Sequence, residues 1–218
     1  MAYIPHLATC QVCRTIHYKW LLCLAIAMVT LMAACWPDGL AHLRYDRSGL
    51  MGGELWRAIT AHLVHLNLPH LFLNLLGLLL ICELLWGELP LRHGIGLLGF
   101  SGMTISAALW WLYPELAWYA GLSGVLHGLW AGCAFYGLRH TTNASLRSRL
   151  PYLVGALLLA AKLVLEFHYG PSETTTRLIG SGVLTASHLY GALAGAIYML
   201  ILGCVRMRSL SRGALQQH

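Results

Sequence analysis

Three apolar stretches of the chain carry polar side chains that together could perform acyl transfer. In WYAGLSGVLHGLWAGCAFYGL, Ser123 lies near the start of a predicted helix, where the backbone N–H groups lack an intrahelical acceptor. His70 and Asn74, four residues apart in a second stretch, share one face of a helix. A serine hydroxyl, a free N–H and two side-chain donors are the nucleophile and the oxyanion-binding groups of an acyl-transfer site. His188, in a third stretch, would supply the base if its helix contacts that of Ser123.

Small residues at a spacing of four predict this contact. They are Gly124, Gly128 and Gly132 in one stretch and Ser187, Gly191 and Gly195 in the other. Such spacing lets two membrane helices approach until their backbones touch. Any one of these polar residues alone has an ordinary structural explanation, for example a serine that bonds its own i−4 carbonyl. Several of them on three stretches, at one predicted membrane depth, favour a functional site.

The composition predicts that these stretches cross a membrane. Of 218 residues, 58% are hydrophobic and 10% are charged, whereas soluble proteins carry about 25% charged residues. A membrane span needs about 20 apolar residues. The candidate spans are residues 20–36, 69–86, 91–113, 121–138, 150–167 and 179–205. We therefore expect an all-α membrane protein, a bundle of six transmembrane helices, with one domain over residues 20–205.

The basic residues of the predicted loops orient this bundle. Nine lysines and arginines lie on the side of the termini and four on the other side, so the positive-inside rule places both termini in the cytoplasm. Residues 1–19 and 206–218 would be the cytoplasmic segments, and residues 37–68 would lie in the membrane interface. The net charge of +6 reflects this topology. Because the basic residues are scattered over separate loops, we expect no nucleic-acid partner.

A lone CxxC at Cys10–Cys13 is weak support for zinc, because it has no partner pair. The cysteines inside the spans are typical small apolar residues. No metal site or cofactor is predicted from them.

The ordered motifs resemble the rhomboid family of intramembrane serine proteases. The matching positions are Trp56 and Arg57 in ELWR, His65, His70 and Asn74 in the HxxxxHxxxN run, Gly121, Ser123 and Gly124 in GLSG, and His188, Gly191 and Gly195 in the HxxGxxxG pattern. They cover about two-thirds of the chain, from residue 54 to residue 195. The resemblance implies a six-helix bundle whose water-filled cavity opens to the periplasmic side.

The resemblance also implies the roles of the residues. Ser123 would be the nucleophile and His188 the general base, without an acidic third residue. His70, Asn74 and the backbone N–H of Ser123 would form the oxyanion hole. His65 would be a structural or water-organising histidine. No cofactor is implied.

A narrower resemblance is to the rhombosortase branch, carried by HLVHLNLPHLFLN in the second span and by KLVLE in the fifth. It implies single-span substrates with a C-terminal Gly-Gly sorting signal, cleaved at the bacterial inner membrane. Lys162 and Glu166 are four residues apart, so an intrahelical ion pair is their expected role.

Two positions depart from the family pattern. His127 stands where many rhomboids carry an aromatic residue that stacks beneath the catalytic histidine, so His127 could stack there or compete as the base. His188 is favoured, because a residue four positions after Ser123 reaches the hydroxyl awkwardly along the helix wall. Ala61 stands where many rhomboids carry another polar residue, with His62 on a different helix face.

Two other functions stay open. Five histidines in or near spans could bind haem or a metal, although that leaves GLSG and Asn74 unexplained. A catalytically silent rhomboid-like protein could capture single-span clients, although such proteins typically lack Ser123 or His188, and both are present here. A GxSxG hydrolase elbow is excluded, since Val125 follows Gly124 and no strand pattern precedes it.

Overall fold

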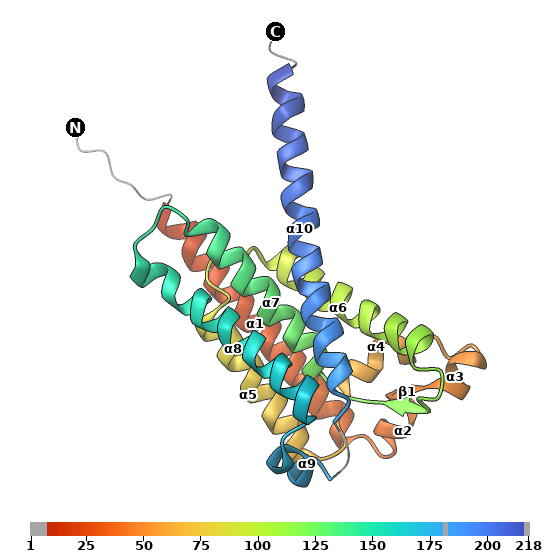
Figure 1. Cartoon of the computed structure of the whole chain (residues 1–218). Coiled ribbons are helices and arrows are strands. Elements are labelled where there is room, and N and C mark those ends of the chain that lie inside the picture. Colours follow the sequence, from red (N-terminus) through yellow and green to blue (C-terminus); the bar gives the residue numbers. More distant parts are fainter. Residues whose placement is uncertain (1–7, 181–182, 216–218) are drawn as a thin grey trace.

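The computed structural model describes residues 8–180 and 183–215 and consists mainly of helices (Figure 1). The long helices are α1 (Ala8–Cys35), α5 (Leu68–Leu84), α6 (Leu91–Leu112), α7 (Ser123–His140), α8 (Leu146–Tyr169) and α10 (Thr185–Leu215). A helix therefore lies at each of the six predicted spans. The outermost parts of the predicted cytoplasmic segments, residues 1–7 and 216–218, lie outside the described residues, as do the side chains of Cys10 and Cys13.

Among the described residues, four helical segments are long and apolar enough to cross a membrane: Tyr18–Cys35, Leu91–Leu112, Leu146–Tyr169 and Thr185–Cys204. A fifth span results if Arg57–Leu63 and Leu68–Leu84, bent by 87°, are counted as one. α7 falls below this hydropathy because Ser123, His127 and Arg139 interrupt its apolar sequence. The fold is thus that of a multi-pass all-α membrane protein, and the count of six spans stays a prediction.

α7 occupies the centre of the bundle, between α8 and α10 in Figure 1, and also packs on α5 and α6. Its glycines and His127 are buried by these neighbouring helices rather than by lipid. α8 is the opposite case, since Gly155 and Leu159 are its buried residues and most of its apolar side chains are exposed. This explains why the central helix tolerates polar residues within its apolar sequence.

The predicted contact between the two small-residue stripes is confirmed. A Cβ atom on Gly191 would run into the carbonyl oxygen of Gly124, and one on Gly195 would run into that of Gly128. Gly132, the third member of the first stripe, instead faces the side chain of Leu97 on α6. α7 and α10 therefore pack backbone to backbone along their first turns.

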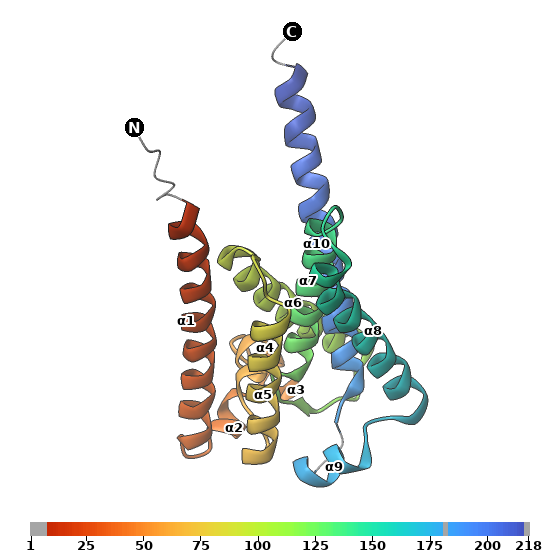
Figure 2. The same cartoon turned by 90° about the vertical axis from the view of Figure 1, so that its left-hand side faces the viewer.

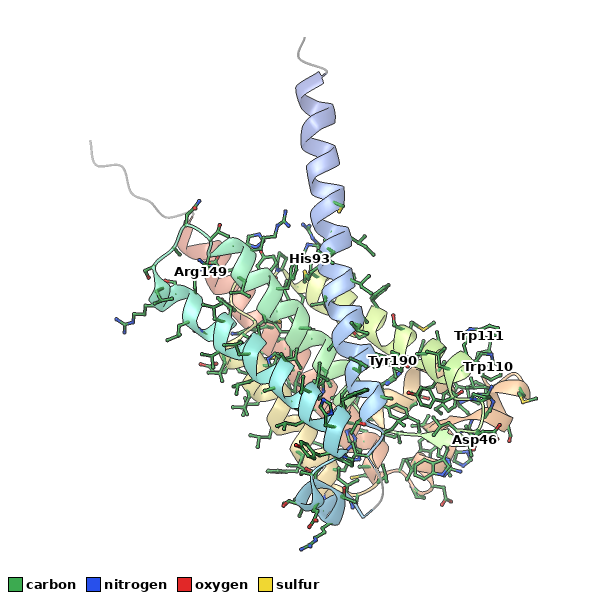
Figure 3. The ribbon with its side chains drawn as sticks, in the orientation of Figure 1. Asp46, His93, Trp110, Trp111, Arg149 and Tyr190 are labelled. Carbon is green, nitrogen blue, oxygen red and sulfur yellow. The ribbon has the colours of Figure 1, made fainter. Side chains whose placement is uncertain are left out.

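The starts of α7 and α10 lie at the end of the bundle away from the start of α1 and the end of α10 (Figures 1 and 2). His93 and Arg149 mark the end near those termini in Figure 3. This arrangement agrees with the prediction that both termini lie on the same side of the membrane.

The predicted interfacial segment folds into a small lobe of α2 (Gly39–Leu43), β1 (Tyr45–Asp46), α3 (Arg47–Met51), α4 (Arg57–Thr60) and the 3-10 helix η1 (Ala61–Leu63). Asp46, Trp110 and Trp111 mark this side of the molecule in Figure 3. Arg57 is buried and donates hydrogen bonds to the carbonyl oxygens of Ala41 (2.8 Å) and Arg44 (3.1 Å). The Trp-Arg motif thus holds the lobe together.

The lobe is joined to the segment that precedes Ser123. β1 pairs antiparallel with β2 (Trp118–Tyr119), with Tyr45 opposite Tyr119. The side chains of Met51 and Leu55 are exposed, which favours the predicted position in the membrane interface. The last short helix, α9 (Glu173–Ile179), connects α8 to α10.

Gly191→Val should separate α7 from α10, because the added side chain meets backbone that cannot rotate away. Overpacking of this kind costs about 1–3 kcal/mol or more. We expect a lower midpoint of thermal unfolding in detergent. Gly99→Val on α6 is the matched control, since a Cβ atom on Gly99 meets nothing within 4 Å. Equal midpoints for both variants would contradict the backbone-to-backbone packing.

Candidate active site

Ser123 is the first residue of α7, and two hydrogen bonds hold the backbone before it. Gly121 has a φ of 136°, a conformation that favours glycine. Its N–H donates to the Ala61 carbonyl oxygen (2.9 Å), and its carbonyl oxygen accepts from the Tyr119 hydroxyl (3.0 Å). A Cβ atom at Gly121 would lie 2.9 Å from Cε1 of His70. The GLSG motif therefore lets the His70 ring approach the start of α7.

His188 reaches the hydroxyl of Ser123. Its Nε2 lies 2.9 Å from Ser123 Oγ, and its side chain is buried. His188 lies in the first turn of α10, directly after Ser187, whose carbonyl oxygen packs against Gly124. The close packing of the two helices thus brings the residues expected to be nucleophile and base within hydrogen-bond distance.

His127 stacks on His188, with ring centroids 4.1 Å apart and planes 6° from parallel. Its Nδ1–H donates to the carbonyl oxygen of Ser123 (2.7 Å). Among the described residues, no hydrogen bond joins His127 to the Ser123 hydroxyl. This geometry agrees with stacking as the role of His127 and favours His188 as the base.

Two side chains of α5, His70 and Asn74, carry hydrogen-bond donors and line a cavity together with Ser123. The Leu66 N–H donates to His70 Nδ1 (3.5 Å), so the ring proton of neutral His70 lies on Nε2, next to Gly121. The Asn74 amide donates one hydrogen bond to the His70 carbonyl oxygen (3.0 Å). An amide has a second N–H, which Asn74 keeps for another acceptor. With the first-turn N–H of Ser123, these are the expected oxyanion donors.

His65 packs edge-on against His70, with ring centroids 5.0 Å apart. Both of its ring nitrogens are buried, and neither has a hydrogen-bond partner within residues 8–180 and 183–215. This position agrees with the structural or water-organising role that the family resemblance implies.

Two other motif residues lie outside the site. His62 points away from Ser123, and its Nε2 lies 3.0 Å from the Gly102 carbonyl oxygen and 3.1 Å from Ser106 Oγ, so it connects η1 to α6. Trp56 is exposed on the lobe. His62 and His65, which are three residues apart, therefore do not bring their rings onto one ligand.

Glu166 is the residue that sequence reasoning assigned to an intrahelical ion pair alone. Its ion pair with Lys162 is present. Its other oxygen, Oε2, lies 2.7 Å from Nδ1 of His188. The family resemblance implies no acidic third residue, whereas in the structure α8 brings this carboxylate to the side of the imidazole opposite Ser123.

A signal for this contact exists in the sequence. A carboxylate within an apolar span is costly unless it has partners, and such residues usually face the bundle interior. That reasoning predicts a partner for Glu166, although it does not identify His188.

Two cavities open at Ser123 and His70. One of about 430 Å³ lies beside β2 and the start of α10, with Leu66, Trp118 and Leu184 in its wall. The other, about 530 Å³, lies between α5 and α8 and has a mainly apolar lining that includes Leu73, Leu158 and Lys162. The polar cluster around Ser123 thus borders an apolar cavity wall.

Residues 52–204 match the family described as Rhomboid domain. The chain therefore belongs to the rhomboid family, whose members are intramembrane serine proteases. A comparison with curated proteins found no match.

His127→Phe should keep the reaction of Ser123 with a fluorescent fluorophosphonate, because a phenyl ring can also stack on His188. His127→Ala removes the ring, and since ring stacking contributes about 0.5–1.5 kcal/mol, its labelling rate should fall about two- to tenfold. The measurement is the labelling rate of purified protein in detergent. Complete loss in His127→Phe, with labelling retained in His188→Ala, would identify His127 as the base.

Proposed function

We propose that this chain is an intramembrane serine endopeptidase in which Ser123 is the nucleophile and His188 the general base. The observation that carries the proposal is the 2.9 Å separation of Ser123 Oγ and His188 Nε2 beside unused hydrogen-bond donors. A general base must lie within hydrogen-bond reach of the proton that it takes, and this pair meets that requirement without a substrate.

The reaction follows from these positions. Ser123 Oγ attacks the scissile carbonyl carbon while His188 Nε2 takes the hydroxyl proton. The negative charge that develops on the carbonyl oxygen is received by His70 Nε2–H, the Asn74 amide and the Ser123 N–H. His188 then gives its proton to the leaving amine, and a water molecule hydrolyses the acyl-enzyme with His188 again as the base.

Membrane-anchored exported proteins are the proposed substrates. The apolar cavity between α5 and α8 suits the side chains of a transmembrane helix. A peptide bond must be extended to reach Ser123, and glycines before a span favour unwinding, because glycine is a poor helix former. A C-terminal Gly-Gly signal followed by one span and a basic tail has this property. This choice rests on the resemblance to the rhombosortase branch.

The proposed setting is the bacterial inner membrane, with both termini cytoplasmic and the site toward the periplasm. Two observations support it. The predicted loops near the termini carry most of the basic residues. The starts of α7 and α10, where Ser123 and His188 lie, are at the opposite end of the bundle (Figure 2).

Metal binding is the second candidate, because one ligand atom each of His127, Glu166 and His188 lies within 4.8 Å of the others among the described residues. The two imidazole planes are 6° from parallel, so their lone pairs lie in separate planes. One ion cannot lie on both lone-pair axes unless a ring turns. Metal analysis and a visible absorption spectrum of purified protein test for a metal and for haem.

Ser123→Ala and His188→Ala should each abolish proteolysis while the protein still inserts and purifies. Loss of a nucleophile or its base typically reduces the rate by about 10⁴-fold or more. The test is fluorophosphonate labelling, together with release of an exported reporter fused to a Gly-Gly tail and one span. A reporter with Leu-Leu in place of Gly-Gly is the control.

The outcomes separate the candidates. Folded wild type that neither labels nor cleaves, yet co-purifies with the uncut reporter, would support client capture instead of proteolysis. Cleavage of both reporters would support the protease and contradict the Gly-Gly specificity.

Asn74→Ala should slow cleavage without abolishing it, because His70 and the Ser123 N–H remain as donors. Loss of one oxyanion donor costs about 10²–10³-fold in rate. Initial rates of reporter cleavage check this. A rate equal to that of wild type would remove Asn74 from the oxyanion hole.

A further inference from the structure

We propose that Glu166 is a positioning residue of the reaction centre, which makes the site a hydrogen-bonded Ser123–His188–Glu166 triad instead of a pair. The inference rests on the proposed function and goes beyond it, since it assigns a role to a third helix. α7, α10 and α8 would each contribute one member.

The two ring nitrogens of His188 contact different residues on opposite sides of the ring. Nε2 lies 2.9 Å from Ser123 Oγ, and Nδ1 lies 2.7 Å from Glu166 Oε2. An ionised carboxylate can only accept a hydrogen bond, so the Nδ1–H of His188 donates to Glu166. A neutral imidazole has one ring proton, and Nε2 is then free to receive the proton of the serine hydroxyl. Glu166 thus selects the tautomer that acts as a base.

The carboxylate is itself held in place. Its other oxygen, Oε1, forms the ion pair with Lys162, one turn earlier on α8. The exposed fraction of the side chain is 11% for Glu166 and 39% for Lys162, so Lys162 is the more solvent-accessible residue of the pair. Lys162 therefore compensates the charge of a carboxylate that would be costly to bury alone. When His188 becomes protonated, the same carboxylate faces the new positive charge.

A comparison within the chain separates this role from an ordinary helix ion pair. Arg177 and Glu173 on α9 have the same spacing of four, with side chains 80% and 87% exposed. Within the part of the chain that the structure describes, the Glu173 carboxylate forms its ion pair with Arg177 on the same helix. Glu166 instead contacts both its own helix and α10. The ion pair with Lys162 does not require Glu166 to contact His188, so the contact with His188 needs a separate explanation.

His188 is consequently fixed on three sides. Ser123 contacts Nε2, Glu166 contacts Nδ1, and the His127 ring covers one face of the imidazole at 4.1 Å. The stack prevents tilting of the ring, and the carboxylate prevents a flip that would exchange the two nitrogens. When a catalytic group is already oriented before the reaction, the activation barrier does not include the entropic cost of orienting it.

Glu166→Gln is the decisive variant, because glutamine keeps the length and shape of the side chain. Its amide can donate to Nδ1, which favours the His188 tautomer with the proton on Nε2, and that tautomer cannot accept the serine proton. An equivalent change in a serine-protease triad lowers kcat by about 10⁴-fold. We expect a fall of about 10²–10⁴-fold in the maximal labelling rate by the fluorophosphonate. The probe concentration for half-maximal rate should not change, since the probe does not bind to Glu166.

The conservative variant and a control complete the experiment on full-length protein in detergent. Glu166→Asp should recover part of the rate, because it restores a carboxylate at a slightly longer distance. Glu173→Gln removes the carboxylate of an exposed ion pair with the same spacing and should label like wild type.

Equal maximal rates for Glu166→Gln and wild type, with Ser123→Ala unlabelled, would overturn the triad and leave the proposed protease intact. No labelling of folded wild type would count against the protease itself.

A second measurement does not depend on the stability of the variant. Nitrogen NMR of wild type with ¹⁵N-labelled histidine, assigned by comparison with His188→Ala, reports which ring nitrogen of His188 carries the proton. A proton on Nδ1 supports the triad. A proton on Nε2 in the neutral ring would overturn it, whatever happens to the Glu166→Gln variant.

Discussion

The contact between the backbones of α7 and α10 is the constraint on which the rest of the structure depends. Gly191 lies against the Gly124 carbonyl, and Gly195 lies against that of Gly128. Ser123 begins α7, and His188 lies in the first turn of α10, so the distance between their side chains follows directly from the distance between the two helix axes. Glycine stripes in membranes usually serve packing alone. In this chain the same stripes also set a hydrogen bond of 2.9 Å between a hydroxyl and an imidazole.

The bundle also resolves the conflict between a polar reaction and an apolar solvent. α7 carries the serine and a histidine, and its neighbours on every side are protein. α8 exposes apolar side chains along most of its length, yet Lys162 and Glu166 within its apolar part pair with each other. His70 and Asn74 stand on the buried face of α5, while Phe72 and Leu76 of the same helix are exposed. Polar groups are therefore collected at one depth, where they serve as partners for one another.

Local patterns made much of this structure predictable. The helix positions follow from apolar runs, and the α7–α10 contact follows from glycines at a spacing of four. Ser123, His188, His70 and Asn74 are predictable as site residues because polar residues within spans are rare and their spacing is informative. The contact of Glu166 with His188 was not predictable in this way, because Lys162 already satisfies the carboxylate within α8. Which helix the second oxygen faces depends on the rotation of α8 in the bundle. The partners of His62 on α6 escaped prediction for the same reason.

The contact between Glu166 and His188 has a consequence for the position of α8. This helix packs chiefly on α7 and much less on α10, and it buries few residues. Its polar link to α10 therefore carries a larger share of its attachment than the polar links between better packed helices do. α8 is also one wall of the apolar cavity, in which Lys162 stands beside Ser123 and His188. Any movement of α8 away from α10 lengthens the bond between Glu166 and His188. Lys162 in the cavity wall and Glu166 beside His188 belong to the same helix. In the proposed triad, a displacement of α8 would therefore change the cavity and the contact that orients His188 together.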